Sequence, residues 1–253
     1  MLIRIARVAA VVFGLAAIYT RFLRSWILTW GATDAEAAAT LPGDELLEDA
    51  DGVATRAIHI DAPPSAVWPW IAQMGPAPRG GAYTYDWIEN LLGMNMHSVD
   101  QVLPEFQHPK LGDTIGYGSN RMRVARIEPE HELSWRSEDG NWVWSFLLNA
   151  QDGATRLISR NRFRLPTLAH RLGMIPMEPG SLVMERKMLL GIKQRAERLE
   201  LMAHQQVRRL PVVDDDGRLV GILAQADIAR EAKDKDSGET LQDISQTPTG
   251  PRA

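Results

Sequence analysis

RAIHIDAPPSAVWPWIAQMG, residues 56–75, changes its hydrophobic period from two to about 3.6 at a pair of prolines. Ahead of the prolines, Ile58, Ile60 and Ala62 alternate with Ala57, His59 and Asp61, as expected for a β-strand. After the prolines, Val67, Trp70, Ile71 and Met74 recur at helical spacing. Pro63 and Pro64 mark the change, because proline fits a first helical turn and keeps the preceding residue extended. The stretch therefore predicts a strand that leads directly into a helix.

This strand, proline pair and helix resemble the opening of the START-like superfamily, the SRPBCC or polyketide cyclase/dehydrase and lipid transport group. The resemblance implies an α+β helix-grip fold, in which a curved antiparallel sheet holds a long C-terminal helix around a cavity. Four segments in order resemble a membrane-anchored bacterial branch of this group: WGATDAE (30–36), LPGDEL (41–46), IDAPPSAVWPWIAQMG (60–75) and RGGAYTYDWIEN (79–90). We treat their order as more specific than any one segment.

Composition indicates a globular chain and excludes several kinds of site. The 253 residues are 45% hydrophobic and 24% charged, which is enough for one core with small appendages. A net charge of −4 argues against a nucleic-acid surface, which needs a basic excess on one face. The absence of cysteine excludes disulfides, thiolate catalysis and cysteine-ligated metals, and it fits either side of a membrane.

The first 33 residues contain no Asp or Glu, and Val8 to Thr20 is an apolar run between Arg7 and Arg21. Its 13 residues would reach only about 20 Å as a helix, against a hydrocarbon core of roughly 30 Å. Extension through Trp30 gives enough length, with the arginines reaching the interface, so we favour a single transmembrane anchor over residues 1–30. A cleaved signal peptide and a helix lying on the membrane surface are the alternatives. Arginines flank both ends, so orientation stays open.

Residues 31–52 form an acidic connector that we expect to run over the domain surface. A second helix is predicted at 85–94. Turn signals then separate five predicted strands of an antiparallel meander, at 113–118, 121–128, 132–137, 141–149 and 155–165. A loop marked by proline and glycine, 165–180, precedes a long helix at 181–205, which the resemblance makes the gripped helix. The START-like domain thus covers residues 53–203.

The last two predicted strands alternate clearly in character. Trp142, Trp144, Phe146 and Leu148 share one face of their strand, while Arg156, Arg160, Arg162 and Arg164 share a face of the next. We therefore expect a sheet that is covered on one face and solvated on the other.

Candidate ligand-cavity residues follow from this alternation. On the concave face we place Trp135, Trp142, Trp144, Phe146, Ser159, Asn161 and Phe163. Ser159 and Asn161 are informative because a polar group on a covered face needs a partner, which is a ligand, water or backbone. In the superfamily that this chain resembles, the region of Tyr83, Tyr85, Asp86 and Glu89 borders the cavity mouth; packing and solvation of the same residues is the simpler interpretation.

No catalytic motif is present, since GxSxG, HExxH, GxGxxG and GxxxxGK[ST] are all missing. His97 and Asp100 form the best local pair, because a carboxylate can orient a histidine for proton transfer. With Tyr85 they are weak catalytic candidates, and helix and loop capping is the simpler interpretation of the pair. The six histidines are scattered without paired spacing, so we expect no metal site, and we expect no cofactor.

The tail contains a second resemblance. VRRLPVVDDDGRLVGILAQADIARE (207–231) resembles the second half of a CBS domain, with two strands, an Asp-Gly turn and a helix. A complete CBS domain needs an earlier strand and helix, and the gripped helix occupies that space. Asp227 stands where such domains hold adenosine nucleotides, but Ala224 replaces the expected hydroxyl residue. We assign a small ββα unit to residues 204–232 and a disordered tail to residues 233–253. The CBS resemblance implies that a second copy of the chain is a partner, through a homodimer formed by the ββα unit.

The expected function is a membrane-anchored binding or carrier domain for a hydrophobic small molecule or lipid, without chemistry on it. A cyclase- or hydrolase-like enzyme using the same cavity is one alternative. A nucleotide-responsive sensor acting through the tail is another.

Overall fold

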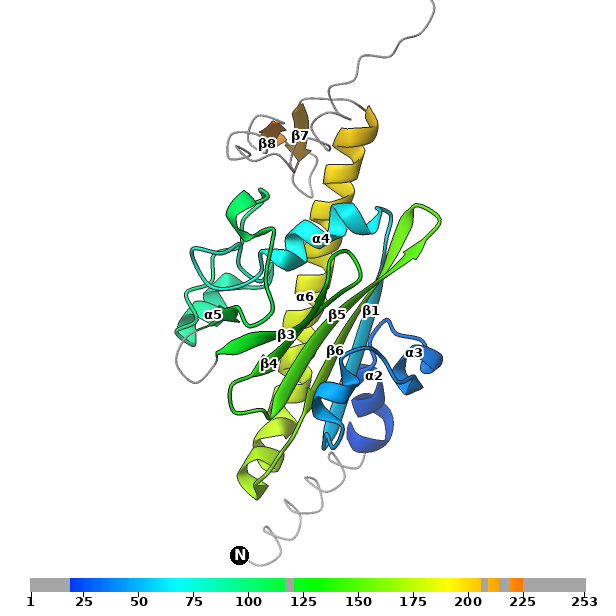
Figure 1. The fold of residues 1–253 in the computed structure, drawn as a ribbon, viewed down its shortest axis with the longest axis vertical. Coiled ribbons are helices and arrows are strands. Elements are labelled where there is room, and N and C mark those ends of the chain that lie inside the picture. The colour runs from blue at the N-terminus through cyan, green and yellow to red at the C-terminus, as the bar shows by residue number, and fades with distance from the viewer. Residues whose placement is uncertain (1–18, 117–120, 206–208, 214–218, 225–253) are drawn as a thin grey trace, which may run out of the picture.

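A six-stranded antiparallel sheet and a long C-terminal helix make up the fold in a computed structural model, which describes residues 19–116, 121–205, 209–213 and 219–224. The strands are β1 (Gly52–Ile60), β2 (Thr114–Ile115), β3 (Met122–Glu128), β4 (Glu132–Ser137), β5 (Trp142–Gln151) and β6 (Ala154–Phe163), in the order β1-β6-β5-β4-β3-β2. Helix α6 (Leu168–Gln205) runs along one face of this sheet (Figure 1). The predicted α+β class, with a sheet that packs on a long C-terminal helix, is confirmed.

The remaining elements are short. They are η1 (Tyr19–Leu23), α2 (Arg24–Leu28), α3 (Asp34–Ala38), η2 (Asp44–Leu47), α4 (Pro64–Ala72), α5 (Asp86–Leu91) and η3 (Pro104–Phe106), with a hairpin of β7 (Arg209–Val213) and β8 (Leu219–Ala224) in the tail. Strand β1 leads into α4 with Pro64 in its first turn, as residues 56–75 predicted.

The core lies between the concave face of the sheet, α4 and the later half of α6. Ile60 and Leu157 of the sheet, Ile71 of α4 and Ile192 of α6 belong to this one buried cluster. The helix contributes apolar residues at helical spacing, Met188, Leu189, Ile192, Ala196 and Leu199. This packing fixes α6 against the sheet and sets which side chains line the concave face.

Helix α6 begins at Leu168, so the prediction of a loop over 165–180 is wrong for most of that segment. Pro176 and Pro179 lie inside the helix, although proline removes a backbone donor and disfavours a helix interior. Tertiary contacts stabilise the turn that holds these prolines. Glu178 accepts hydrogen bonds from Arg24 Nη2 at 2.7 Å and from the Tyr19 hydroxyl at 2.5 Å.

The outer face of the sheet is covered, so the prediction of a solvated second face is wrong over β1, β5 and β6. Residues 31–51, here named the strap, cross this face. The strap's acidic groups pair with the outward arginines of β6: Glu36 with Arg156, Asp44 with Arg160, and Asp49 with Arg164. Ala57, Leu147 and Ile158 form a second buried cluster with Ala32 and Leu41 beneath the strap. Strand arginines that looked solvated therefore hold the predicted connector.

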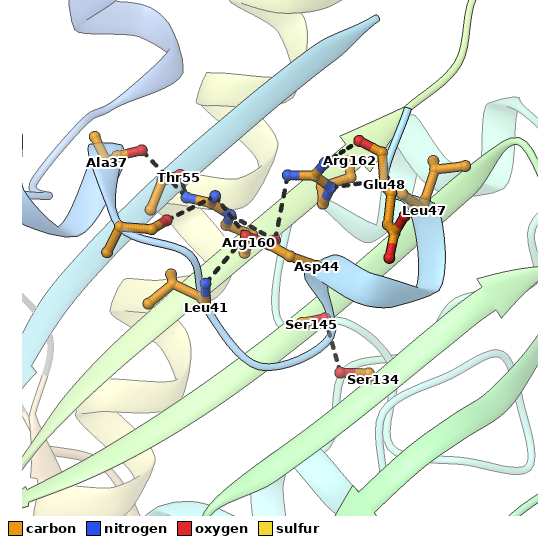
Figure 2. A network of polar contacts seen from close by, with 11 residues as sticks. Ala37, Leu41, Asp44, Leu47, Glu48, Thr55, Ser134, Ser145, Arg160 and Arg162 are labelled. Atoms are coloured by element: carbon orange, nitrogen blue, oxygen red, sulfur yellow. Dashed lines mark hydrogen bonds and ion pairs between the residues drawn. The ribbon is translucent and has the colours of Figure 1, made fainter. Parts of the chain in front are cut away.

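Figure 2 shows the centre of this strap network. Arg160 Nε and Nη2 donate to the two carboxylate oxygens of Asp44 at 3.0 and 2.8 Å, and Arg160 Nη1 donates to Thr55 Oγ1 at 2.9 Å. Gly43 has φ +87°, and a Cβ there would lie 2.4 Å from Ser145 Oγ. The strap needs glycine at this point because of both its backbone conformation and its close approach to the sheet.

The interpretation of residues 22–30 as part of a membrane helix is also wrong. Ile27 and Leu28 are buried in the protein, and Trp30 packs against the main core. Arg24 binds Glu178 of α6 instead of reaching a membrane interface. Apart from its end at Tyr19 and Thr20, the apolar run lies outside the described residues. Within the part of the chain that the structure describes, we find no helix with the length and apolar character needed to cross a bilayer.

Candidate functional site

Three aromatic side chains of β5 lead from the core toward solvent on the concave face. Phe146 is fully buried, and its ring lies 5.0 Å from that of Trp144. Trp144 stacks on Trp142 with 5.9 Å between ring centroids and 12° between the planes. Trp142 is 40% exposed, while Trp135 behind the stack is buried. The stack therefore presents a flat indole surface at the edge of the core.

Ser159 and Asn161 of β6 lie on the same face as these tryptophans, as the strand parity predicted. Trp144 Nε1 donates to Ser159 Oγ at 2.9 Å, and Trp142 Nε1 donates to Asn161 Oδ1 at 2.9 Å. Asn161 Nδ2 in turn donates to the carboxylate of Glu185 on α6 at 3.3 Å. These buried polar groups find their partners in the protein, and they fix the orientation of both indoles.

Glu185 and Arg56 form an ion pair beneath the stack, with both side chains buried. Arg56 also donates from Nε to the Ile27 carbonyl at 3.1 Å and from Nη2 to Ser181 Oγ at 3.0 Å. Burial raises the pKa of the Glu185 carboxyl, and the Arg56 charge and the Ser159 hydroxyl counter that rise. This buried ion pair, with its additional hydrogen bonds, fixes the positions of β1, β6 and α6 relative to one another.

The sequence interpretation missed this ion pair, although a signal for it was present. Arg56 has the same strand parity as Ile58 and Ile60, so it lies on the apolar face of β1. Glu185 lies three residues after Leu182 and four before Leu189, which places it on the apolar side of α6. Two opposite charges at apolar-face positions of facing elements indicate a buried pair.

Phe163 closes one side of the site. It is buried and pairs across the sheet with Trp142 and with Gly52. A Cβ at Gly52 would lie 2.2 Å from the Phe163 ring, so only glycine leaves room for this aromatic side chain.

Tyr83, predicted to border the cavity, lies deep between α4 and α6. Its hydroxyl donates to the Trp70 carbonyl at 2.9 Å, and Arg195 Cζ lies 4.6 Å above its ring. Burial raises the pKa of the Tyr83 hydroxyl. Tyr83 thus packs among the helices, whereas the tryptophan stack is formed by side chains of the sheet.

The three weak catalytic candidates do not meet. His97 is exposed, and its ring contacts Asn95. Asp100 is exposed and forms an ion pair with Arg195 at 2.7 Å. Tyr85 lies at the surface, where the Lys187 ammonium is above its ring. The expected His97 and Asp100 pair is therefore replaced by contacts of each residue with other neighbours. The geometry of these three residues gives no support to proton transfer by them.

Glu89 of α5 is buried with one carboxylate oxygen, Oε2, that has no hydrogen-bond partner in the described structure. Burial raises the pKa of Glu89, and the nearby charge of Asp86 raises it further. Asp86 itself accepts hydrogen bonds from the Ser98 backbone nitrogen at 2.7 Å and hydroxyl at 2.6 Å. Among the described residues no cluster of three metal-ligating side chains is present.

Residues 199–234 match the family model of the CBS domain. The match confirms the CBS-like segment predicted in the tail, and its first residues belong to α6. Strands β7 and β8 pair as an antiparallel hairpin within it, and Ala224 is the last residue of β8. Asp227, the candidate nucleotide residue, lies outside the described residues.

No curated protein matches this chain. Among solved structures, a Polyketide_cyc-like protein of Corynebacterium glutamicum is similar at 16% identity and a TM-score of 0.32, over 60% of this chain and 91% of that one. A Mesorhizobium loti protein, MLL2253, is similar at 18% identity and a TM-score of 0.33, over 57% and 97% of the two chains. CalU16 of Micromonospora echinospora is similar at 17% identity and a TM-score of 0.28, over 58% and 84%. Values this low carry no information on a ligand or a reaction.

Proposed function

We propose that this protein is a membrane-anchored binding or carrier protein that holds a hydrophobic small molecule or lipid without transforming it. The observation that carries the proposal is the half-exposed stack of Trp142 on Trp144, ordered by Asn161 and Glu185. A flat indole surface binds apolar groups through its area and contributes no reacting group. The buried polar groups beside it are hydrogen-bonded within the protein, so they hold the indoles in place and leave the flat apolar surface as the contact for a ligand.

The motif order that resembles the membrane-anchored START-like branch also supports this proposal. The apolar run at Val8 to Thr20 supports attachment to a membrane surface, because its 13 residues are too short to span a bilayer without residues 22–30. The separation of His97, Asp100 and Tyr85 removes the specific support that the enzyme alternative had. Binding without chemistry is therefore the function that the site supports best.

Extraction of the purified full chain into organic solvent, followed by mass spectrometry, tests the proposal. We expect an enriched hydrophobic compound with the native chain and with Trp87→Ala, which removes an equally large exposed indole on α5. We expect at least about tenfold less of it with Trp142→Ala, because loss of an aromatic contact that contributes about 1.4 kcal/mol weakens binding tenfold. An extract with no enriched compound, or equal amounts from both variants, contradicts the proposal.

The CBS match favours a second candidate, a sensor in which the tail binds an adenosine nucleotide between two copies of the chain. Ala224 weighs against it, since the hydroxyl expected there is missing. Calorimetry with AMP and ATP, combined with light scattering of the full chain, decides between the two. Binding heat from a dimer supports the sensor, and a monomer with no heat excludes it.

A further inference from the structure

Two segments present large apolar side chains to solvent at one end of the molecule. In the first half of α6, Leu168, Leu172, Ile175 and Met177 are exposed, with Leu168 at 70%. In η1 and α2, Phe22, Leu23 and Trp26 are exposed, with Phe22 at 69%. Large apolar side chains grouped in this way mark an interaction surface more often than isolated ones do.

The two segments are held next to each other, and their exposed apolar side chains together are here named the apolar end. The Arg24 guanidinium forks onto both oxygens of Glu178, from Nη2 at 2.7 Å and from Nε at 3.0 Å. Tyr19 donates to the same carboxylate at 2.5 Å. In Figure 1 this half of α6 extends beyond the sheet, on the side where α2 lies. The ordered contact at Glu178 fixes the relative positions of the two groups of apolar residues.

Charge at the apolar end suits an anionic lipid surface. Within residues 19–33 and 165–181 the acidic residue is Glu178, and its side chain is only 5% exposed beneath Arg24. Arg24 is neutralised by Glu178, so Arg21 and Arg171 supply the positive charge, with Arg171 also 3.4 Å from Asp51 of the strap. Basic side chains beside apolar ones and a tryptophan are typical of segments that lie in a membrane interface.

The chain that precedes the described structure joins it at this same place. Tyr19 is bound to Glu178, and the residues before it include the apolar run from Val8, with no carboxylate. A segment of that composition, leading directly into an exposed apolar surface, favours lipid as what covers both.

The apolar end also adjoins the tryptophan stack. Trp142 is the cross-strand partner of Phe163, and the chain runs from Phe163 through Leu165 into α6 at Leu168. The Leu165 carbonyl accepts a hydrogen bond from Arg171 Nε at 3.3 Å, which ties the first turn of α6 to the end of β6. The exposed edge of Trp142 thus lies at the end of the sheet from which α6 begins.

We propose that the apolar end lies in the surface of a lipid bilayer and directs the Trp142 edge of the binding site toward it. The inference rests on the proposed membrane-anchored binding function and adds which part of the domain contacts lipid. A hydrophobic ligand would then pass between the bilayer and the stack without crossing bulk water.

The absence of cysteine makes a direct test simple. Leu172→Cys and Ile175→Cys are each labelled with the fluorophore NBD in the full chain and reconstituted into phosphatidylcholine and phosphatidylglycerol vesicles. Leu201→Cys, an exposed leucine near the other end of the same helix, is the matched control. Circular dichroism verifies that the variants fold.

Doxyl-labelled lipid quenches a fluorophore that lies in the bilayer interface. We expect it to quench positions 172 and 175 at least about twofold more than position 201, as for an apolar face buried in the interface. Equal quenching at all three positions overturns the proposal. Blue-shifted emission from positions 172 and 175 without quenching by the labelled lipid also overturns the proposal, because a protein segment or a second copy of the chain then covers these positions.

Flotation of the same vesicles tests the anchor separately. A chain that floats with vesicles while positions 172 and 175 stay unquenched retains its anchor and loses the docking surface. A chain with no enriched ligand but quenched labels retains the docking surface and loses the binding function.

Discussion

At the scale of single residues, the fold depends on charges that are buried in pairs on both faces of the sheet. Arg56 meets Glu185 on the concave face, and Arg160 meets Asp44 beneath the strap. Removal of one member leaves an uncompensated buried charge, which costs far more than the net contribution of the pair itself. The two pairs therefore attach α6 and the strap to the sheet, and how much each pair contributes to stability depends on how deeply its charges are buried.

Arg160→Met should lower the free energy of unfolding by about 2–3 kcal/mol, because the buried Asp44 carboxylate then keeps only a hydrogen bond from the Leu41 backbone nitrogen and the 3.5 Å contact with Arg162. Arg164→Met, on the same face of β6 but against the exposed Asp49, should cost much less, because water solvates Asp49 when its partner is removed. Urea unfolding measures both. Combining Arg160→Met with Asp44→Leu should recover most of the loss. Equal losses from the two single variants would contradict the role of burial.

The pair of Glu36 and Arg156 predicts a dependence of stability on pH. Hydrogen bonds from Arg156 lower the pKa of Glu36 from 4.5 to about 2. A lowered carboxyl pKa stabilises the fold above the unfolded pKa, and this contribution is lost as pH falls from about 4.5 to about 2. Glu36→Gln should therefore cost about 1–2 kcal/mol at neutral pH, discounted for partial solvent screening.

Urea unfolding between neutral pH and about pH 3 measures the Glu36 effect, and the difference between the native chain and Glu36→Gln should shrink as pH falls. Asp34→Asn, an exposed change in the same helix, should cost roughly 0.5 kcal/mol through the helix dipole alone. A difference that grows toward acid pH would be inconsistent with the Glu36 pair.

Which residues face the concave side could be predicted from sequence, but their partners could not. The alternation in β5 and β6 placed Trp142, Trp144, Ser159 and Asn161 on one face, and the structure puts them there. That Glu185 accepts from Asn161 depends on how α6 crosses the sheet, which no local pattern contains. The arginines of β6 were predicted to be solvated, because alternation along a strand indicates which residues share a face of the sheet but not which segment covers that face.

At the scale of elements, α6 has two halves with different sources of stability. The half from Leu182 to Met202 buries an apolar stripe in the core, whereas the half from Leu168 to Gly180 is mostly exposed. Two prolines and two glycines made this first half look like a loop, since local propensity there opposes a helix. The contact of Glu178 with Arg24 and Tyr19 joins elements far apart in sequence, so the local pattern could not predict it.

Glu178→Ala should therefore loosen the first half of α6 alone. Hydrogen bonds to a charged group contribute about 1.5–3 kcal/mol, so amide exchange over 168–180 should become about tenfold faster or more. Exchange over 188–202 should not change, because core packing holds that half. Val183→Ala, an exposed apolar position in the later half, should leave both rates as they are in the native chain. Hydrogen-exchange mass spectrometry resolves the two halves, and unchanged rates over 168–180 would mean that other contacts hold them.

At the scale of the whole molecule, the sheet domain and the tail meet within the last turns of α6. The CBS match starts at residue 199, yet Leu199 belongs to the main core and Met202 is buried as well, so the two units share the last turns of α6. The sequence indicated this overlap, because the gripped helix occupies the place where a complete CBS domain needs its first helix. Membership of the main core places Leu199 in the sheet domain.

A chain ending at Gln205 should consequently unfold at nearly the same temperature as the full chain, whereas a chain ending at Arg198 should not. Each large apolar side chain fully buried contributes about 1.5–3 kcal/mol, so loss of Leu199 and Met202 removes about 3–6 kcal/mol. That is a large part of the roughly 5–15 kcal/mol that stabilises a domain. Scanning calorimetry of the two truncated chains measures this. If the chain ending at Gln205 were destabilised as much as the shorter one, the tail would have to pack as part of the sheet domain, and the boundary would lie beyond α6.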